Sequence, residues 1–168
     1  MEYHRFIGWL CYLAVISFGS FLVGRLLPYR WFDAERFPYR AAAWEDGGRF
    51  YARLGLPRWQ KKLPDMSRIF SAIMPAKAMT DKSPEGLATM ISETCIAEFT
   101  HAALAVLGFG GLFFWHSGWG IALTAVYVLG NVPFVLIQRY NRPRLQRLKI
   151  MTEKRLARQA CHASKEGE

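Results

Sequence analysis

Four polar side chains interrupt the start of an apolar stretch, and their types could carry out acid–base chemistry. In ISETCIAEFTHAALAVL these residues are Glu93, Thr94, Glu98 and His101. On a helix with about 100° between residues, Thr94, Glu98 and His101 fall on one face, and Glu98 and His101 are close enough to touch. A carboxylate beside an imidazole orients the ring and stabilises its protonated form, as a general base requires. The alternative is that Glu98 and His101 only satisfy one another's hydrogen bonds in a helix interface.

A second polar cluster follows another apolar run, in NVPFVLIQRYNRPRL. Guanidinium groups suit a diphosphate or a carboxylate, and a plain basic flank has no need of glutamine or asparagine. We therefore predict a substrate-binding site that consists of Thr94, Gln138, Arg139, Asn141, Arg142, Arg144, Lys61 and Lys62. Asn131, deeper in the run, is predicted either to bridge two helices or to donate a hydrogen bond to a reacting carbonyl oxygen.

The spacing from Glu98 to His101 is also that of one E-x-x-H unit. Carboxylate di-iron bundles use two such units and two further glutamates. Only one unit is present here, so we predict no metal site and no cofactor, although Glu93 could add a ligand. The three cysteines are odd in number and unmatched in spacing, which indicates free thiols at Cys11, Cys95 and Cys161.

The elements that must position these residues are membrane helices, because about 20 apolar residues are enough to cross a bilayer. Three stretches qualify, at residues 6–28, 96–115 and 119–137. Trp115 and Trp119 flank the turn WHSGW as interfacial aromatics, so the second and third spans should form a tight hairpin. The predicted fold is an all-α integral membrane protein, with a single membrane domain over residues 1–168.

The remaining segments are predicted to lie at the membrane surface. Residues 29–92 are rich in Trp, Tyr, Phe and Arg and are broken by glycine and proline, which favours short interfacial helices. Residues 143–162 place apolar side chains at helical spacing between basic ones, and Pro143 could open this tail helix. We expect the amphipathic tail to contact anionic lipid headgroups.

Charge indicates the orientation in the membrane. The net charge is +9, with 11 Lys and Arg between Tyr29 and Ser92 and nine after Ile137, but only Arg5 on the other side. The positive-inside rule then places the N-terminus outside and both basic segments in the cytoplasm. The first span has no small-residue cleavage site, so we read it as an uncleaved anchor. Nucleic acid is excluded as a partner, because no binding motif accompanies the apolar runs.

Together the two polar motifs resemble the glycosyl-4,4′-diaponeurosporenoate acyltransferases, small bacterial membrane proteins assigned to the last step of staphyloxanthin synthesis. The second-span motif fits at Glu93, Thr94, Ala97, Glu98 and His101. The C-terminal motif fits at Asn131, Pro133 and every residue from Gln138 to Leu145. A weaker match covers Gly48, Trp59, Lys61, Leu63, Pro64 and Asp65. The resemblance implies an enzyme of the bacterial cell membrane that places a fatty acyl group on the sugar of a glycosylated carotenoid.

The residues and the resemblance together predict acyl transfer, with acyl-CoA as donor, to a hydroxyl of a glycosylated carotenoid or related membrane lipid. His101 would deprotonate that hydroxyl, Glu98 would orient His101 with Glu93 nearby, and Asn131 or an arginine would stabilise the oxyanion. Two other classes stay open. One is a membrane lipid methyltransferase or reductase that binds a nucleotide cofactor through the arginine-rich motif, and the other is a non-catalytic helper subunit. The acyl chain length and the oligomeric state are not predicted.

Overall fold

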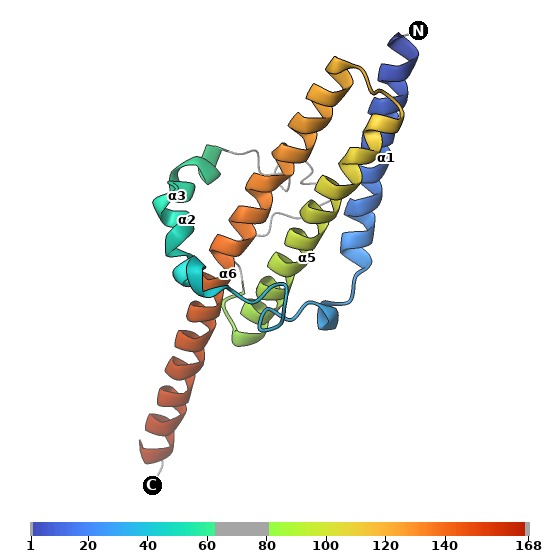
Figure 1. Cartoon of the computed structure of the whole chain (residues 1–168). Helices are drawn as coiled ribbons and strands as arrows, with labels where there is room; N and C mark the ends of the chain where they lie inside the picture. Colours follow the sequence, from blue (N-terminus) through green and yellow to red (C-terminus); the bar gives the residue numbers. More distant parts are fainter. Residues whose placement is uncertain (1, 63–80, 167–168) are drawn as a thin grey trace. The chain divides into compact units, whose positions relative to one another are not determined.

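The computed structural model describes residues 2–62 and 81–166, and every regular element in these ranges is helical. Figure 1 shows the three long helices, α1 (Glu2–Leu26), α5 (Pro84–Gly108) and α6 (Gly118–Glu166). The short helices are η1 (Tyr29–Trp31), η2 (Ala43–Gly48), α2 (Arg49–Arg53), α3 (Leu56–Trp59), η3 (Gln60–Lys62) and η4 (Phe109–Phe113). Each long helix contains a stretch long and apolar enough to cross a membrane. The prediction of an all-α protein with three such helices is confirmed.

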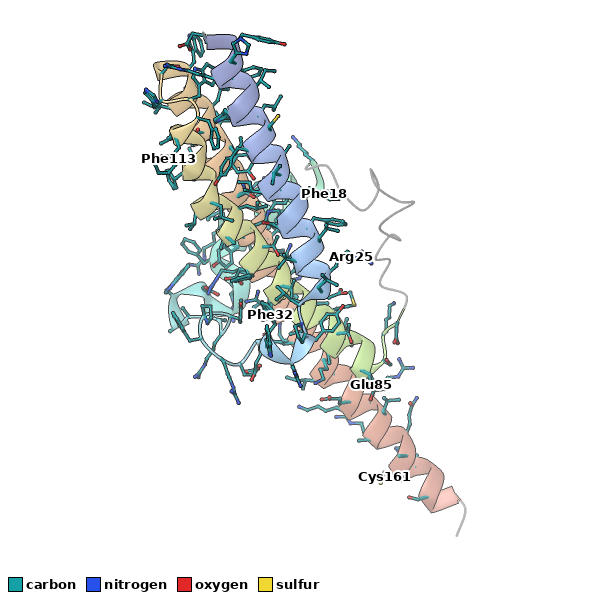
Figure 2. All side chains as sticks on the ribbon, turned by 90° about the vertical axis from the view of Figure 1, so that its right-hand side faces the viewer. Phe18, Arg25, Phe32, Glu85, Phe113 and Cys161 are labelled. Atoms are coloured by element: carbon teal, nitrogen blue, oxygen red, sulfur yellow. The ribbon has the colours of Figure 1, made fainter. Side chains whose placement is uncertain are left out.

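The chain divides into two compact units, which we describe separately. Unit 1 consists of Met1–Asp33 and Glu93–Arg139, and unit 2 of Ala34–Ser92 and Tyr140–Glu168. Large apolar side chains such as Phe18 and Phe113, 65% and 90% exposed, cover the outside of unit 1 (Figure 2). Such exposure would be costly in water and is expected where lipid surrounds the helices.

In unit 1 the helices α5 and α6 run antiparallel. Glu98 lies beside Arg139, whereas His101, one turn further along α5, lies beside Asn131 on an earlier turn of α6. Still further along α5, a Cβ atom on Gly108 would lie 2.8 Å from the ring of Tyr127. Glycine at position 108 therefore allows the two helices to approach closely.

Helix α1 also runs antiparallel to α5. The hydroxyl of Tyr12, in the first half of α1, donates to the carbonyl of Leu107 at 2.7 Å. Near its end, a Cβ atom on Gly24 would lie 3.1 Å from Thr100 Oγ1. The N-terminus of α1 and the turn before α6 therefore share one end of unit 1, and Glu93, Glu98 and Arg139 share the other.

The core of unit 1 lies at the end that holds the N-terminus of α1. Trp9, Leu13 and Trp115 are buried there. The Trp9 indole N–H donates to Thr124 Oγ1 at 2.9 Å, and the Trp115 indole N–H donates to a Glu2 carboxylate oxygen at 2.7 Å. Trp115, expected to face lipid headgroups, is 8% exposed and belongs to this core, whereas Trp119 is 74% exposed.

Helix α5 begins earlier than the predicted start of the second span at residue 96. Ser83 Oγ accepts the backbone N–H of Gly86 at 3.0 Å, and Pro84 is the first helical residue. A serine at the N-cap followed by proline is a strong helix start. The Asp81 carboxylate in turn accepts the backbone N–H of Ser83 at 2.8 Å. As a result, Glu93 lies in the interior of α5.

Helix α6 is one unbroken helix of 49 residues, and this corrects the predicted separate tail helix opened by Pro143. A proline inside a helix removes one N–H and one hydrogen bond to the preceding turn. The residues after Pro143, from Arg144 to Lys149, are arginine, leucine, glutamine and lysine, which have high helix propensity. The helix therefore continues through Pro143, as it also does through Pro133.

In unit 2 the segment around α2 is fastened to the later part of α6. Asp46, Gly47 and Gly48 have consecutive positive φ angles of 49°, 59° and 95°. The carbonyl of Gly47 accepts a hydrogen bond from Arg147 at 3.2 Å. A Cβ atom on Gly48 would lie 3.3 Å from the carbonyl oxygen of Tyr140. The two glycines are therefore needed both for the turn and for its close approach to α6.

We predict that the Trp9–Thr124 hydrogen bond contributes about 1 kcal/mol to stability, because both groups are buried in apolar surroundings. Trp9→Phe and Thr124→Val should each lower the midpoint of unfolding in detergent, measured by denaturant titration. The double variant should be less destabilised than the sum of the two. Additive losses would show that the bond contributes nothing beyond packing.

Candidate active site

The centre of the candidate site is a hydrogen-bonded pair of side chains on α5 and α6. His101 Nδ1 lies 3.0 Å from Asn131 Oδ1. Asn131 is 8% exposed, and His101 is half-buried. The His101 ring also stacks on Phe134, with ring centroids 4.6 Å apart and an interplanar angle of 12°. The ring is therefore fixed both along its edge and across its face.

The hydrogen bonds of Asn131 determine which nitrogen of His101 carries the proton. The Asn131 side-chain NH2 donates to the backbone carbonyl of Tyr127 at 2.9 Å, so the other amide atom is the oxygen, which only accepts. In the neutral ring, Nδ1 must then carry the hydrogen and donate it to Asn131. Nε2 is left with its lone pair. No hydrogen-bond partner of Nε2 occurs in the described ranges, so this atom can accept a proton from a bound molecule.

Glu98 does not orient His101, and this corrects the predicted carboxylate–imidazole pair. Glu98 Oε1 lies 3.5 Å from Arg139 Nη1, and the two side chains are only 10% and 18% exposed. A carboxylate in apolar surroundings is stabilised far more by a cation than by a neutral ring. Arg139, brought alongside by the antiparallel α6, supplies that cation, and Asn131 takes the place at His101.

Glu93 and Thr94 lie about one turn nearer the Arg139 end of unit 1. The Tyr29 hydroxyl donates to Glu93 Oε1 at 3.3 Å. Burial, and secondly the negative charge of Glu93, raise the pKa of the Tyr29 hydroxyl, which therefore stays protonated as a donor. Thr94 is 7% exposed and lies on the same face of α5 as Glu98. The face of α5 that carries Thr94 and Glu98 is therefore polar and buried, and the hydrogen bond from Tyr29 to Glu93 connects α5 to η1.

The arginine-rich motif is spread over residues with very different surroundings. Gln138 is half-buried in unit 1, and Asn141 is half-buried in unit 2. Arg142 is 2% exposed, donates to the carbonyl of Tyr39 at 2.7 Å and lies over its ring. Arg144 is exposed and lies 3.2 Å from the Tyr140 hydroxyl. Arg142 therefore serves the packing of unit 2, while Arg144 presents its charge at the surface.

The predicted lysines belong to unit 2. Lys62 is exposed at the end of η3. The side chain of Lys61 lies outside the described part of the chain, as do Leu63, Pro64 and Asp65 of the weaker family match. In residues 2–62 and 81–166, no three His, Cys, Asp or Glu side chains lie close enough together to hold a metal ion.

Unit 1 also has an apolar groove of about 340 Å³ between α1 and α5. Its walls are Ile16, Gly19, Ser20, Val23, Leu27, Phe99, Thr100, Ala103 and Leu107. With about 100° between successive helical residues, Phe99 lies roughly 160° around α5 from His101. The groove therefore opens on a different side of α5 from the imidazole.

Three partners of the site residues were not predicted from the sequence. These are the backbone carbonyl of Tyr127, the ring of Phe134 and the carbonyl of Tyr39. The first two could have been found, because Tyr127, Asn131 and Phe134 are spaced four and three apart and share a helix face. The contact of Arg142 with Tyr39 joins residues 103 apart in sequence, and no local pattern indicates it.

Comparison with known proteins gives one consistent family. A sequence model described as glycosyl-4,4′-diaponeurosporenoate acyltransferase matches residues 28–150. Proteins with that name from two Staphylococcus aureus strains are similar over 150 residues, at 25% identity for strain bovine RF122 / ET3-1 and 26% for strain Newman. The similarity covers 86% and 85% of this chain, respectively, and 87% of each relative. No solved structure matches the chain at a significant level.

We predict that His101 is a neutral Nδ1–H tautomer, which nitrogen NMR of histidine-labelled protein in detergent micelles can measure. The exposed histidines His4, His116 and His162 should show a mixture of tautomers and serve as internal references. Asn131→Leu should abolish the preference at His101, because the acceptor of the Nδ1–H bond is removed. An Nε2–H tautomer in the unmodified protein would contradict this assignment.

Proposed function

Because this chain belongs to the glycosyl-4,4′-diaponeurosporenoate acyltransferase family, we propose that it transfers a fatty acyl group to a hydroxyl of a glycosylated carotenoid or related membrane glycolipid. The donor in this proposal is an acyl thioester, such as acyl-CoA. The chain is an acyltransferase, which argues against the methyltransferase, reductase and helper-subunit alternatives.

One observation carries the mechanism: Asn131 holds the His101 ring so that Nε2 keeps its lone pair. Nε2 takes the proton of the acceptor hydroxyl while the hydroxyl oxygen attacks the acyl carbonyl. The tetrahedral intermediate then collapses, the C–S bond breaks and the C–O ester bond remains. The imidazolium returns its proton to the departing thiolate, so the base is regenerated. Asn131 acts as a positioning residue, because its oxygen already accepts the Nδ1–H.

We assign the oxyanion to Arg139, because its guanidinium carries a full positive charge, whereas Asn131, which already donates to Tyr127 and accepts from His101, could offer only its second amide hydrogen. Arg139 lies at the end of unit 1 that also holds Glu93 and Glu98, and Glu98 fixes its guanidinium. A preorganised cation in apolar surroundings stabilises developing negative charge strongly. Glu93, held by Tyr29, and Thr94 would line the entrance for the acceptor.

The donor phosphates would be held by the exposed cations of the arginine-rich motif. Arg144 and Lys62 are exposed and can form charge-assisted hydrogen bonds with a diphosphate. Asn141, half-buried in the same unit, would assist them, whereas Arg142 would act indirectly by holding the Tyr39 segment in place.

In the membrane, α5 and α6 would form the predicted hairpin, with the N-terminus of α1 outside and the C-terminus in the cytoplasm of a bacterial cell. The basic residue totals on the two sides support this orientation. The segment from residue 34 to residue 59 would lie at the headgroups, where its arginines contact anionic lipid and exposed rings such as Phe37 and Trp44 enter the interface. This arrangement opens the site to a cytoplasmic donor and a membrane-borne acceptor.

We expect His101→Ala to lower the rate of acyl transfer by about 10² to 10⁴, as the loss of a general base does. The assay is lipid mass spectrometry of cells that make glycosyl-4,4′-diaponeurosporenoate, in which a species heavier by one fatty acyl group should appear. His116→Ala, an exposed histidine in the turn before α6, is the matched control and should keep full activity. Activity of His101→Ala within tenfold of the unmodified chain would refute the base assignment.

The positioning role of Asn131 predicts a graded response in the same assay. Asn131→Leu should lose activity by tenfold or more, on the order of the smaller general-base effects. Asn131→Asp keeps an oxygen acceptor for the Nδ1–H bond and should retain clearly more activity than Asn131→Leu. Equal losses in both variants would indicate that Asn131 only packs the helices.

The native cysteines test the orientation. Cys161 is exposed near the end of α6 (Figure 2), and Cys95 is buried. Cys11 is also exposed but lies within the membrane-spanning helix α1, beyond the reach of a membrane-impermeant reagent. A membrane-impermeant maleimide should label Cys161 in inverted vesicles but not in intact cells, and Cys161→Ser should remove the label. A cysteine at the turn, in Cys161→Ser/His116→Cys, should show the opposite pattern. Labelling of Cys161 in intact cells would show that the topology is the reverse of the one proposed.

A further inference from the structure

The apolar groove between α1 and α5 is a feature of unit 1 that the proposed chemistry does not use. Its volume of about 340 Å³ lies within the range of roughly 300–1,000 Å³ that is usual for small-molecule sites. Its wall on α1 runs from Ile16 to Leu27, which is about 16 Å along a helix axis. Of its two hydroxyl-bearing wall residues, Ser20 and Thr100, the second donates to the carbonyl of Ile96 at 2.9 Å. The groove therefore has an elongated, almost wholly apolar wall that suits a hydrocarbon chain.

Gly19, in the wall of the groove, has no packing reason within the described part of the chain. A Cβ atom on Gly19 would meet no atom of another described element within 4 Å, whereas a Cβ atom on Gly24 would lie 3.1 Å from Thr100 Oγ1. Glycine in the interior of a helix costs about 0.5–1 kcal/mol relative to alanine. Close approach to α5 explains that cost at Gly24 but not at Gly19. The space over Gly19 is therefore open to a bound molecule, and a side chain at position 19 would occupy it.

The groove ends beside two polar side chains of the same unit. Leu27, the last wall residue on α1, lies two residues before Tyr29, whose hydroxyl donates to Glu93 Oε1 at 3.3 Å. Glu93 lies seven residues before Thr100 on α5, so these two side chains are about 20° apart around the helix. One face of α5 therefore carries the apolar wall and, nearer the start of the helix, a carboxylate.

The charges at this end favour an uncharged, hydroxylated head group. The negative charge of Glu93 and the positive charge of Arg25, an exposed residue near the end of α1 (Figure 2), act on the Tyr29 hydroxyl in opposite directions. The two charges offset one another, so this end offers no net positive charge to a phosphate. A carboxylate can accept several hydrogen bonds from hydroxyl groups. Tyr29 is 50% exposed, so its ring can pack against the apolar face of a sugar.

We propose that the α1–α5 groove together with Tyr29 and Glu93 is a loading site for the acceptor glycolipid, with the hydrocarbon chain in the groove and the sugar at the Tyr29–Glu93 pair. This inference rests on the proposed acyl transfer, because it assigns a binding site to the acceptor. Glu93 precedes His101 by eight residues, about 12 Å along α5. A sugar at Glu93 is therefore held near the base but not at it, and it moves to His101 in a second step. The loading site thus determines how tightly the acceptor binds and not the rate of the chemical step.

Photocrosslinking locates a bound chain without requiring catalysis. The probe is a dodecyl glucoside with a diazirine in its alkyl chain, added to the full protein in nanodiscs of neutral phosphatidylcholine, and labelled residues are mapped by mass spectrometry. Labels should concentrate on groove residues such as Ser20, Val23 and Ala103. His101→Ala should be labelled as the unmodified chain is. Unlabelled dodecyl glucoside should compete about tenfold better than dodecyl phosphate, because only the sugar head forms favourable hydrogen bonds with the Glu93 carboxylate.

Filling the groove should weaken acceptor binding. We expect Gly19→Leu to lower groove labelling by about tenfold or more, since the loss of only two buried methylene contacts weakens binding by about that factor. With palmitoyl-CoA as donor, Gly19→Leu should raise KM for the glycosylated acceptor by a similar factor and keep kcat, because position 19 does not contact the reacting groups. Ala14→Leu is the matched control, because Ala14 is exposed on α1 outside the groove, and it should change neither labelling nor KM.

Several outcomes would overturn the loading site. These are equal labelling of all lipid-exposed helix faces, unchanged labelling in Gly19→Leu, an equal loss in Ala14→Leu, and equal competition by dodecyl phosphate. Groove labelling without acyl transfer to any acceptor would support the loading site and refute the proposed function. Acyl transfer with a KM that Gly19→Leu leaves unchanged would refute the loading site alone.

Discussion

The constraint on which the structure of unit 1 depends is that a polar group among apolar helices must find a partner. Three such groups in the long helices of unit 1 are partnered from a different helix: Trp9 by Thr124, Tyr12 by the carbonyl of Leu107, and His101 by Asn131. These bonds determine which faces of α1, α5 and α6 pack together and how far each helix is shifted along its axis relative to the others. The same requirement that orders the helices also fixes the orientation of the imidazole.

The sequence suggested that Glu98 and His101 form one pair, whereas the structure has two separate pairs, His101 with Asn131 and Glu98 with Arg139. A neutral amide orients the neutral imidazole, and a carboxylate holds the guanidinium. Each polar group is therefore matched to a partner of suitable charge. A base that is neutral at rest and a cation that is always charged are the two groups that the proposed acyl transfer uses.

The three long helices could be predicted from the sequence, because the length of an apolar run and the charge of its flanks indicate a membrane helix. The residues of the candidate site were also recognisable by type, since Glu98, His101, Asn131 and Arg139 are unusual in such runs. Their pairing was not predictable, because spacing along one helix shows which residues can touch but not which residue of a neighbouring helix competes. Pro143 misled for a related reason: its local preference to begin a helix was outweighed by the helix-forming residues on both sides. Contacts such as Arg142 with Tyr39 depend wholly on tertiary structure.

The imidazole and its hydrogen-bond acceptor leave the ribosome at different times. His101 precedes Asn131 by 30 residues, which at about 5–20 residues per second corresponds to roughly two to six seconds of synthesis. During that interval α5 carries a polar ring whose acceptor has not yet been made, in a helix where unsatisfied polar groups are costly. Insertion of the last helix therefore completes the hydrogen bonding of the helix before it, and a truncated nascent chain cannot contain an oriented base. In the proposed mechanism, the base is therefore oriented only after Asn131 has been synthesised and inserted.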